Sequence, residues 1–253
     1  MEIVFLTALG VGGATILGAV LGFVFKNISH KFSDIVLSFA AGVMLAAAVI
    51  GLIMPSLEFG TGLWALPVTV LGIFSGAICL SLMDRLVPHL HRLSGAEQEA
   101  HPDQAGKLNK VLLFVMAIAI HNLPEGIAAG VGFGTGNDGE AITIAAGIAL
   151  QNIPEGMVII APMLAAGMKP GRTFAIAAMT GAVEVLGTLV GFFAVSISTA
   201  ILPFALAFAG GTMLYVISDE MIPETHAHGS EQGATYALLA GFALMLAMSH
   251  YLG

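Results

Sequence analysis

The chain has 253 residues, of which 57% are hydrophobic and only 9% are charged, and its formal net charge is −8. A soluble protein carries about 25% charged residues, so this composition excludes an ordinary soluble domain. The mean hydropathy of +0.95 predicts an all-α integral membrane protein. We expect the protein to lie in the lipid bilayer and to bind no nucleic acid.

Apolar stretches follow one another along the whole chain. A transmembrane helix needs about 20 mostly apolar residues. On that scale the sequence predicts eight spans, over residues 3–25, 33–55, 63–84, 108–132, 141–166, 173–196, 201–220 and 234–252. We therefore expect a single transmembrane domain over residues 1–253, with a long loop at about 85–107 between the third and fourth spans.

The basic residues predict the orientation of these spans. All eight fall in the first, third and fifth loops, at Lys26, Lys31, Arg85, Arg92, Lys107, Lys110, Lys169 and Arg172. These three loops lie on one side of the membrane if there are eight spans. Because basic loops remain in the cytoplasm, the loops are predicted to be cytoplasmic and both termini to lie outside.

The long third loop contains His89, His91 and His101 among acidic residues. Short histidine-rich tracts can bind metal weakly, which would make this loop a cytosolic metal-collecting segment. A solvated linker with incidental histidines fits the sequence equally well. The sequence leaves these two interpretations open.

Short similar segments indicate an internal repeat. Residues 18–22 resemble residues 187–191, and residues 41–45 resemble residues 210–214, with the same separation of 169 positions in both comparisons. The first span starts outside and the sixth starts inside, so the two halves would be inverted. This pattern is typical of secondary transporters, whose sites lie near the membrane midplane. It predicts that helices 1–3 repeat as helices 6–8 around a central pair formed by helices 4 and 5.

A six-residue motif occurs twice inside the predicted spans. The first copy runs from His121 to Gly126 and the second from Gln151 to Gly156, and both read Asn, an apolar residue, Pro, Glu and Gly after the first position. Residues three and four apart share one helix face, so each glutamate aligns with the first two residues of its motif. Each proline frees a backbone carbonyl, and broken helix inside a membrane is tolerated where it lines a polar cavity or is buried in protein.

A third acid, Glu184, lies in the predicted sixth span. Ionisable groups at this depth cost roughly 2.5–3.5 kcal/mol each on insertion scales. No lysine or arginine accompanies Glu125, Glu155 and Glu184, so they cannot all stay ionised unless cations or protons join them. Imidazole, carboxylate and amide groups favour zinc, iron, manganese, cobalt, nickel or cadmium over sodium or potassium, without choosing among them.

The duplicated motif, the eight spans and the histidine-bearing loop resemble the ZIP (Zrt/Irt-like) metal transporters, most closely their bacterial GufA-like branch. The resemblance implies import of a divalent metal, zinc first, across the cytoplasmic (inner) membrane of a bacterium. It also implies a homodimer. In each chain, a moving bundle of helices would carry the metal site past a static bundle of helices. Cadmium, iron and manganese are further expected cargoes.

The resemblance further implies a binuclear metal site. The first ion would lie among His121, Glu125, Gln151 and Glu155, with Met44 as a possible soft ligand. The second would lie among Asn122, Asn152, Glu184 and the two bridging glutamates of the motifs. Many relatives have histidine at position 151 or aspartate at position 152, so the second position and the metal preference stay open.

Polar residues also close the predicted seventh span on its cytoplasmic side. The resemblance suggests an exit station for the ion there, which would include Asp219, Glu220, Glu224, His226 and His228. The alternative is a polar helix end that faces water.

Two other functions fit part of the pattern. An intramembrane zinc-dependent hydrolase is one, because the first motif superficially resembles a zincin helix. Zincins place glutamate directly after the first histidine, however, whereas Asn122 stands there. A channel-like metal pore is the other, and the sequence does not separate it from a carrier. We expect a transporter and no enzyme.

Overall fold

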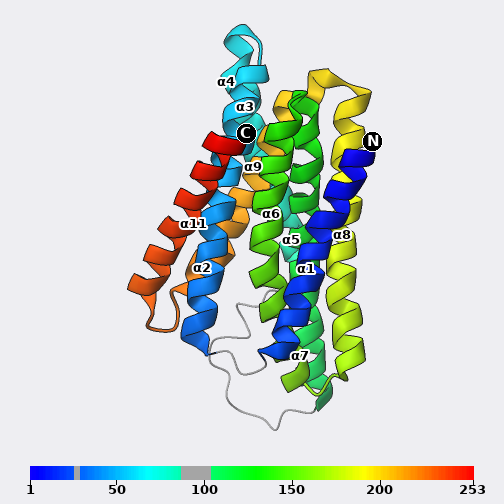
Figure 1. Cartoon of the computed structure of the whole chain (residues 1–253), viewed down its shortest axis with the longest axis vertical. Coiled ribbons are helices and arrows are strands. Elements are labelled where there is room, and N and C mark those ends of the chain that lie inside the picture. Colours follow the sequence, from blue (N-terminus) through cyan, green and yellow to red (C-terminus); the bar gives the residue numbers. More distant parts are fainter. Residues whose placement is uncertain (26–28, 87–103) are drawn as a thin grey trace.

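The computed structural model describes the backbone of residues 1–25, 29–86 and 104–253, and the side chains of these residues except 84–86 and 104–117. This part of the chain is helical, with short turns and no strand (Figure 1). The α-helices are α1 (Glu2–Val24), α2 (His30–Ala46), α3 (Met54–Phe59), α4 (Ala65–Leu86), α5 (Gln104–Gly132), α6 (Asp138–Val158), α7 (Ile160–Ala165), α8 (Pro170–Ile197), α9 (Leu202–Val216), α10 (Ile222–Thr225) and α11 (Glu231–Leu252).

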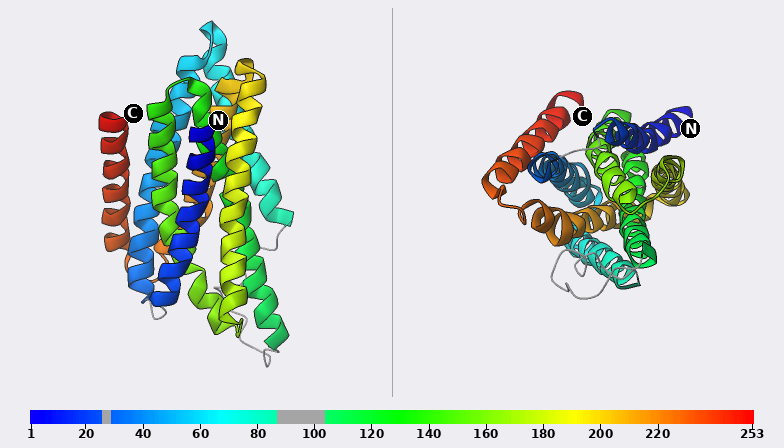
Figure 2. Two further views of the ribbon diagram at one scale, coloured as in Figure 1. Left: turned by 45° about the vertical axis from the view of Figure 1, so that its right-hand side comes forward. Right: turned by 90° about the horizontal axis from the view of Figure 1, so that it is seen from below.

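Seven helical segments of the described residues are long and apolar enough to cross a membrane, which confirms a multi-pass membrane protein. They are Glu2–Val24, His30–Phe59, Gly62–Met83, Asp138–Ala165, Pro170–Ile197, Thr199–Thr225 and Glu231–Leu252. The predicted fourth span falls in α5, a helix of 29 residues, and the count of eight stays a prediction. Both termini lie toward the same end of the molecule (Figures 1 and 2).

The long helices form two groups. In the first, which we call the motif bundle, α1 packs against α6 and α8, and α5 packs against α8. In the second, which we call the flanking bundle, α2 packs against α11 and α4 packs against α9. Helix α11 lies on the outer side of α2 (Figure 2). The two bundles meet mainly where α2 contacts α6 and where α5 contacts α9.

Glycines let the helices of the motif bundle approach closely. A Cβ atom at Gly18 of α1 would lie 2.1 Å from the carbonyl oxygen of Ile153 in α6. A Cβ atom at Gly126 of α5 would lie 2.3 Å from the carbonyl oxygen of Glu184 in α8. Small residues at such contacts are the usual means of close packing between helices in a membrane.

A tight turn joins the two motif helices. Gly136, with φ of +77°, closes the 3₁₀ turn η4 (Phe133–Thr135) that follows α5. Glycine adopts this left-handed conformation without steric cost. The Asn137 side chain then accepts hydrogen bonds from the backbone N–H groups of Gly139 and Glu140 and so caps α6. This turn brings α5 and α6 into contact as antiparallel neighbours.

Two helices of the flanking bundle contain a π-helical segment. The first, η1 (Ala47–Ile53), continues α2 into α3, and the second, η6 (Ile217–Met221), continues α9 into α10. A proline follows shortly after each segment, at Pro55 and Pro223. Single π-helical turns inside α-helices are frequent at functional sites, and η6 contains Glu220, one of the predicted site residues.

Candidate metal site

Both copies of the motif lie on unbroken helix, with Pro124 inside α5 and Pro154 inside α6. A proline inside a helix leaves the carbonyl group four residues earlier without its usual N–H donor. The two helices contact each other, so the copies face a common region of the motif bundle. Both motifs therefore lie on helices, as the sequence predicts.

The polar side chains of the motifs are almost completely buried, except that Glu155 is partly exposed. Relative exposures are 7% for His121, 1% for Glu125 and 0% for Gln151. Several of their oxygen atoms are buried and have no hydrogen-bond partner among the described residues, namely Oδ1 of Asn122 and Asn152, both carboxylate oxygens of Glu125, Oε1 of Gln151 and Oε1 of Glu155. Buried polar groups are normally paired, so oxygens of this kind from two helices are what a bound cation would satisfy.

The three buried carboxylates lie close enough to repel one another. The charges of Glu155 and Glu184 both act on Glu125, and that of Glu155 also acts on Glu184. Among the described residues, no lysine or arginine forms an ion pair with any of them. A divalent cation bound among these carboxylates would neutralise this repulsion.

Glu184 stands at the centre of a hydrogen-bond network. Its Oε1 accepts hydrogen bonds from the Thr15 hydroxyl at 2.6 Å and from the Asn122 amide. Its Oε2 accepts a hydrogen bond from the Asn152 amide at 2.7 Å. The structure therefore brings together both asparagines and the third acid, and it adds Thr15, which we did not predict. Thr15 lies 169 positions before Glu184, the separation of the predicted repeat, and that separation is the signal that could have found it.

His121 connects the two bundles. Its Nε2 atom lies 2.9 Å from Oε1 of Glu220, which stands in the π-helical segment η6. The Glu220 side chain is 24% exposed, whereas that of His121 is 8% exposed. The pair thus joins the buried motif of α5 to a more accessible carboxylate of the flanking bundle.

No set of three or more histidine, cysteine, aspartate or glutamate side chains in the described part of the chain lies close enough together to hold a metal ion by itself. The residues that accompany the motif carboxylates are three amides and one imidazole. A complete ligand shell would therefore combine carboxylate, imidazole and amide oxygen groups, which suits several divalent transition metals.

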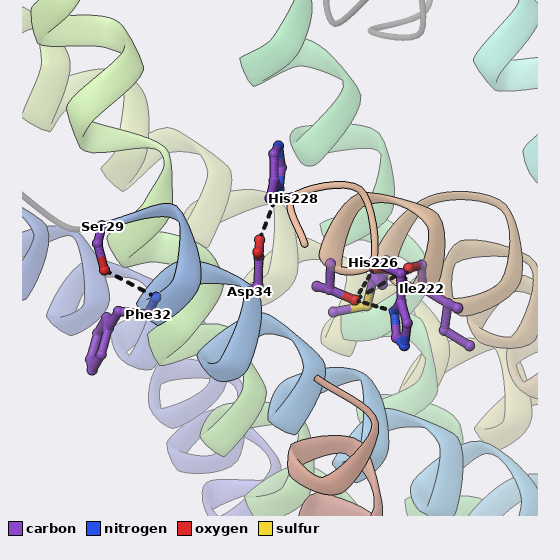
Figure 3. Close-up of polar contacts among 8 residues, drawn as sticks. Ser29, Phe32, Asp34, Ile222, His226 and His228 are labelled. Carbon is purple, nitrogen blue, oxygen red and sulfur yellow. Dashed lines mark hydrogen bonds and ion pairs between the residues drawn. The ribbon is translucent and has the colours of Figure 1, made fainter. Parts of the chain in front are cut away.

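The remaining predicted residues do not form one cluster. Met44 is fully buried in the hydrophobic core, and Asp219 is exposed. Figure 3 shows His228, whose Nδ1 lies 3.1 Å from Oδ1 of Asp34, and His226, whose Nδ1 lies 2.9 Å from the carbonyl oxygen of Ile222. Of the predicted exit station, Glu220 forms an ion pair with the motif residue His121. The loop residues His89, His91 and His101 lie outside the described residues.

Comparisons with known proteins agree with this chemistry. A family profile described as ZIP zinc transporter matches residues 89–249. The chain is 40% identical to the zinc transporter GufA of Myxococcus xanthus, over 96% of both chains. It is 39% identical to the zinc transporter ZIPB of Bordetella bronchiseptica, over 95% of this chain and 78% of that protein. The human zinc transporter ZIP11 is 31% identical over 95% of this chain and 94% of its own length.

Proposed function

The chain belongs to the ZIP zinc transporter family, and from this premise we propose that it is a secondary transporter that brings zinc into the cytoplasm. Members of this family are transporters and not enzymes, so the hydrolase alternative finds no support. Cadmium, iron(II), manganese, nickel and cobalt are further candidate cargoes, because the same ligand types suit them.

The observation that carries this proposal is the set of buried, unpartnered oxygens on the two motifs. Glu125 contributes both of its carboxylate oxygens, and Gln151 and Glu155 contribute one each. With the imidazole of His121 beside them, they form the first position of the proposed site. Met44 stays a candidate soft ligand, and Asn122, Asn152 and Glu184 form the proposed second position.

An inverted repeat is part of the same proposal, and equivalent glycine contacts support it. Gly18 meets the carbonyl oxygen of Ile153, and Gly187 meets that of Leu123, with 169 positions between the glycines and 30 between their partners. A second contact type is also duplicated, since Gly126 faces the carbonyl oxygen of Glu184 and Gly156 faces that of Thr15. Eight is an even number of spans, so both termini would lie on the same side of the membrane. This agrees with their position at the same end of the molecule (Figure 1).

Release toward the cytoplasm would pass Glu220. This carboxylate contacts His121 and is partly exposed. The starts of α2 and α8, which contain Lys31 and Arg172 in the sequence, lie at the end of the molecule opposite the termini (Figure 1). Because basic segments remain in the cytoplasm, we propose that this end faces the cytoplasm. Movement of the motif bundle against the flanking bundle would break and remake the contact between His121 and Glu220.

Uptake into reconstituted vesicles tests the proposed cargo. Zinc is offered alone and then with cadmium, iron(II), manganese, nickel or cobalt as competitor. The proposal predicts saturable zinc uptake with counterflow, which a channel-like pore would not produce. Zinc uptake equal to that of empty vesicles would contradict it.

Cysteine labelling tests the proposed orientation in a bacterial inner membrane. In a Cys79→Ala background, single cysteines placed near Glu2 and Gly136 are expected to react with an impermeant reagent added to intact spheroplasts. One placed near Gly95 is expected to react only after lysis. Reaction near Gly95 before lysis would reverse the orientation.

Crosslinking of the same membranes tests the homodimer that the family resemblance implies.

A further inference from the structure

Tryptophan and tyrosine are distributed unevenly between the two bundles. The chain has one tryptophan and three tyrosines. All four belong to the flanking bundle, with Trp64 directly before α4, Tyr215 in α9, and Tyr236 and Tyr251 in α11. The helices of the motif bundle, α1, α5, α6 and α8, contain neither residue type. Phenylalanine shows no such bias, because it occurs in helices of both bundles.

Three of these four rings face outward from the molecule. Trp64 is 72% exposed, Tyr236 is 66% exposed and Tyr251 is 80% exposed. Leu63, next to Trp64, is 96% exposed. Large apolar side chains that gather at the surface indicate a contact with a partner that is itself partly apolar.

The three exposed rings lie at or near the ends of membrane-spanning segments. Trp64 is the third residue of the segment Gly62–Met83, and Tyr251 is the last but one of the segment Glu231–Leu252. Tyr236 is the sixth residue of that second segment, so about 22 Å of helix separates it from Tyr251. Because helical side chains lean toward the N-terminus of their helix, the ring of Tyr236 reaches further toward the start of α11.

The rings therefore stand toward both ends of the flanking bundle. The junction of α3 and α4 lies at the end of the molecule where α11 ends, and α11 begins toward the opposite end (Figure 1). Trp64 and Tyr251 thus belong to one end of the bundle and Tyr236 to the other. Tryptophan and tyrosine favour the membrane–water interface, because the ring is apolar while its N–H or O–H group meets headgroups and water.

We propose that Trp64, Tyr236 and Tyr251 contact the lipid headgroup regions of the two leaflets and hold the flanking bundle at a fixed depth in the bilayer. Continuity with the spans of α4 and α11 argues for lipid as the partner, since the end of a span lies where hydrocarbon gives way to headgroups. The motif bundle has no tryptophan or tyrosine that could hold it in this way. This anchoring surface does not depend on which ion the protein carries.

The single tryptophan makes the first test direct. Selective excitation of tryptophan in the wild-type protein reports on position 64 alone. The protein is reconstituted into phosphatidylcholine vesicles whose acyl chains carry bromine near the headgroup, at mid-chain or near the chain end. We expect bromine near the headgroup to quench the fluorescence most strongly.

Each other result of this measurement would overturn the proposal. Strongest quenching by mid-chain or chain-end bromine would place Trp64 in the hydrocarbon. Quenching by aqueous iodide without quenching by brominated lipid would place it in water. No quenching by either reagent would mean that protein, such as a second copy of the chain, covers the ring.

Phe74 supplies a matched control on the same helix. It is 63% exposed and stands about 15 Å of helix beyond Trp64. In the variant Trp64→Phe/Phe74→Trp we expect chain-end bromine to quench most strongly, because the midplane lies about 15 Å from each headgroup region. Trp64→Phe/Tyr236→Trp and Trp64→Phe/Tyr251→Trp are expected to give the shallow profile of the wild type. A deep profile at either tyrosine position would overturn the proposal.

Bilayer thickness tests whether the rings hold the depth of the bundle. Quenching of Trp64 is measured in vesicles of shorter-chain and of longer-chain lipids, with bromine near the headgroup or near the chain end. An anchored residue stays at the interface while the helix tilts or the bilayer adapts, so headgroup-proximal bromine is expected to remain the stronger quencher throughout. If chain-end bromine became the stronger quencher in thick bilayers, Trp64 would not hold its depth and the proposal would fail.

Discussion

The two copies of the motif share a backbone frame and differ in what they contact. In both, the asparagine donates to Glu184 and the final glycine packs against a carbonyl oxygen of a neighbouring helix. The α5 copy begins with His121, which reaches Glu220 of the flanking bundle. The α6 copy begins with Gln151, an uncharged amide that is fully buried.

This difference separates two tasks within one site. The shared features hold two carboxylates at equivalent places, so Glu125 and Glu155 can bind one ion from two helices. The unshared feature lies on the α5 copy, where the imidazole connects the buried site with a more accessible carboxylate. Each copy therefore contributes one carboxylate, whereas the ion pair with Glu220 of the flanking bundle is made by His121 of the α5 copy.

Removal of either carboxylate is expected to have the largest effect. Glu125→Ala and Glu155→Ala should each abolish high-affinity zinc binding, because each removes a charge that neither Gln151 nor Asn152 can supply. The fold is expected to survive, since loss of an unpaired buried charge relieves a desolvation penalty. Equilibrium dialysis with radioactive zinc measures the binding. A variant that binds with wild-type affinity would show that the two copies are not equivalent in charge.

Exchange of the first residues sharpens the comparison. His121→Ala should weaken zinc binding by about tenfold or more, equivalent to at least about 1.4 kcal/mol, because imidazole is a strong zinc ligand. Gln151→Ala should weaken it less, and Gln151→His should strengthen it. Isothermal titration gives the three affinities. A larger loss for Gln151→Ala than for His121→Ala would reverse the proposed roles.

The shared backbone frame predicts equal costs for the two motif glycines. A Cβ atom would lie 2.3 Å from a carbonyl oxygen at Gly126 and 2.2 Å from one at Gly156. Overpacking of this kind costs about 1–3 kcal/mol, so both alanine variants should unfold at lower temperature in detergent. The control is Gly13→Ala on α1, where nothing lies within 4 Å. A loss of stability in only one motif variant would argue against an equivalent frame.

The loop histidines are expected to matter least. Replacement of His89, His91 and His101 together should lower zinc uptake by less than about tenfold, or about 1.4 kcal/mol, because both copies of the motif stay intact. Initial uptake rates in vesicles measure this effect. Complete loss of uptake would place an obligatory part of the metal path in that loop.

Hydropathy and spacing predicted much of this arrangement because bilayer crossing depends on the composition of about 20 residues. The helical period placed Asn122 beside Glu125 and Asn152 beside Glu155. The same reasoning did not find Thr15, because its partner depends on where α1 and α8 cross, and that crossing is set by Gly12 and Gly181.

The contact between His121 and Glu220 also could not be predicted from a helical periodicity in the sequence. Glu220 lies in the π-helical segment η6, and such a segment shifts every following side chain relative to the α-helical period. The family resemblance suggested an exit station that would combine Glu220 with His226 and His228. In the structure these histidines bond elsewhere, His226 to Ile222 and His228 to Asp34 (Figure 3).

Zinc uptake by Glu155→Ala in reconstituted vesicles tests the central claim most directly. The matched control is Glu140→Ala, which removes a carboxylate from the first turn of the same helix. If the paired motifs hold the transported ion, Glu155→Ala takes up no more zinc than empty vesicles, and Glu140→Ala takes it up at the wild-type rate. Near wild-type uptake by Glu155→Ala would contradict the claim and reduce the duplicated motif to a structural element.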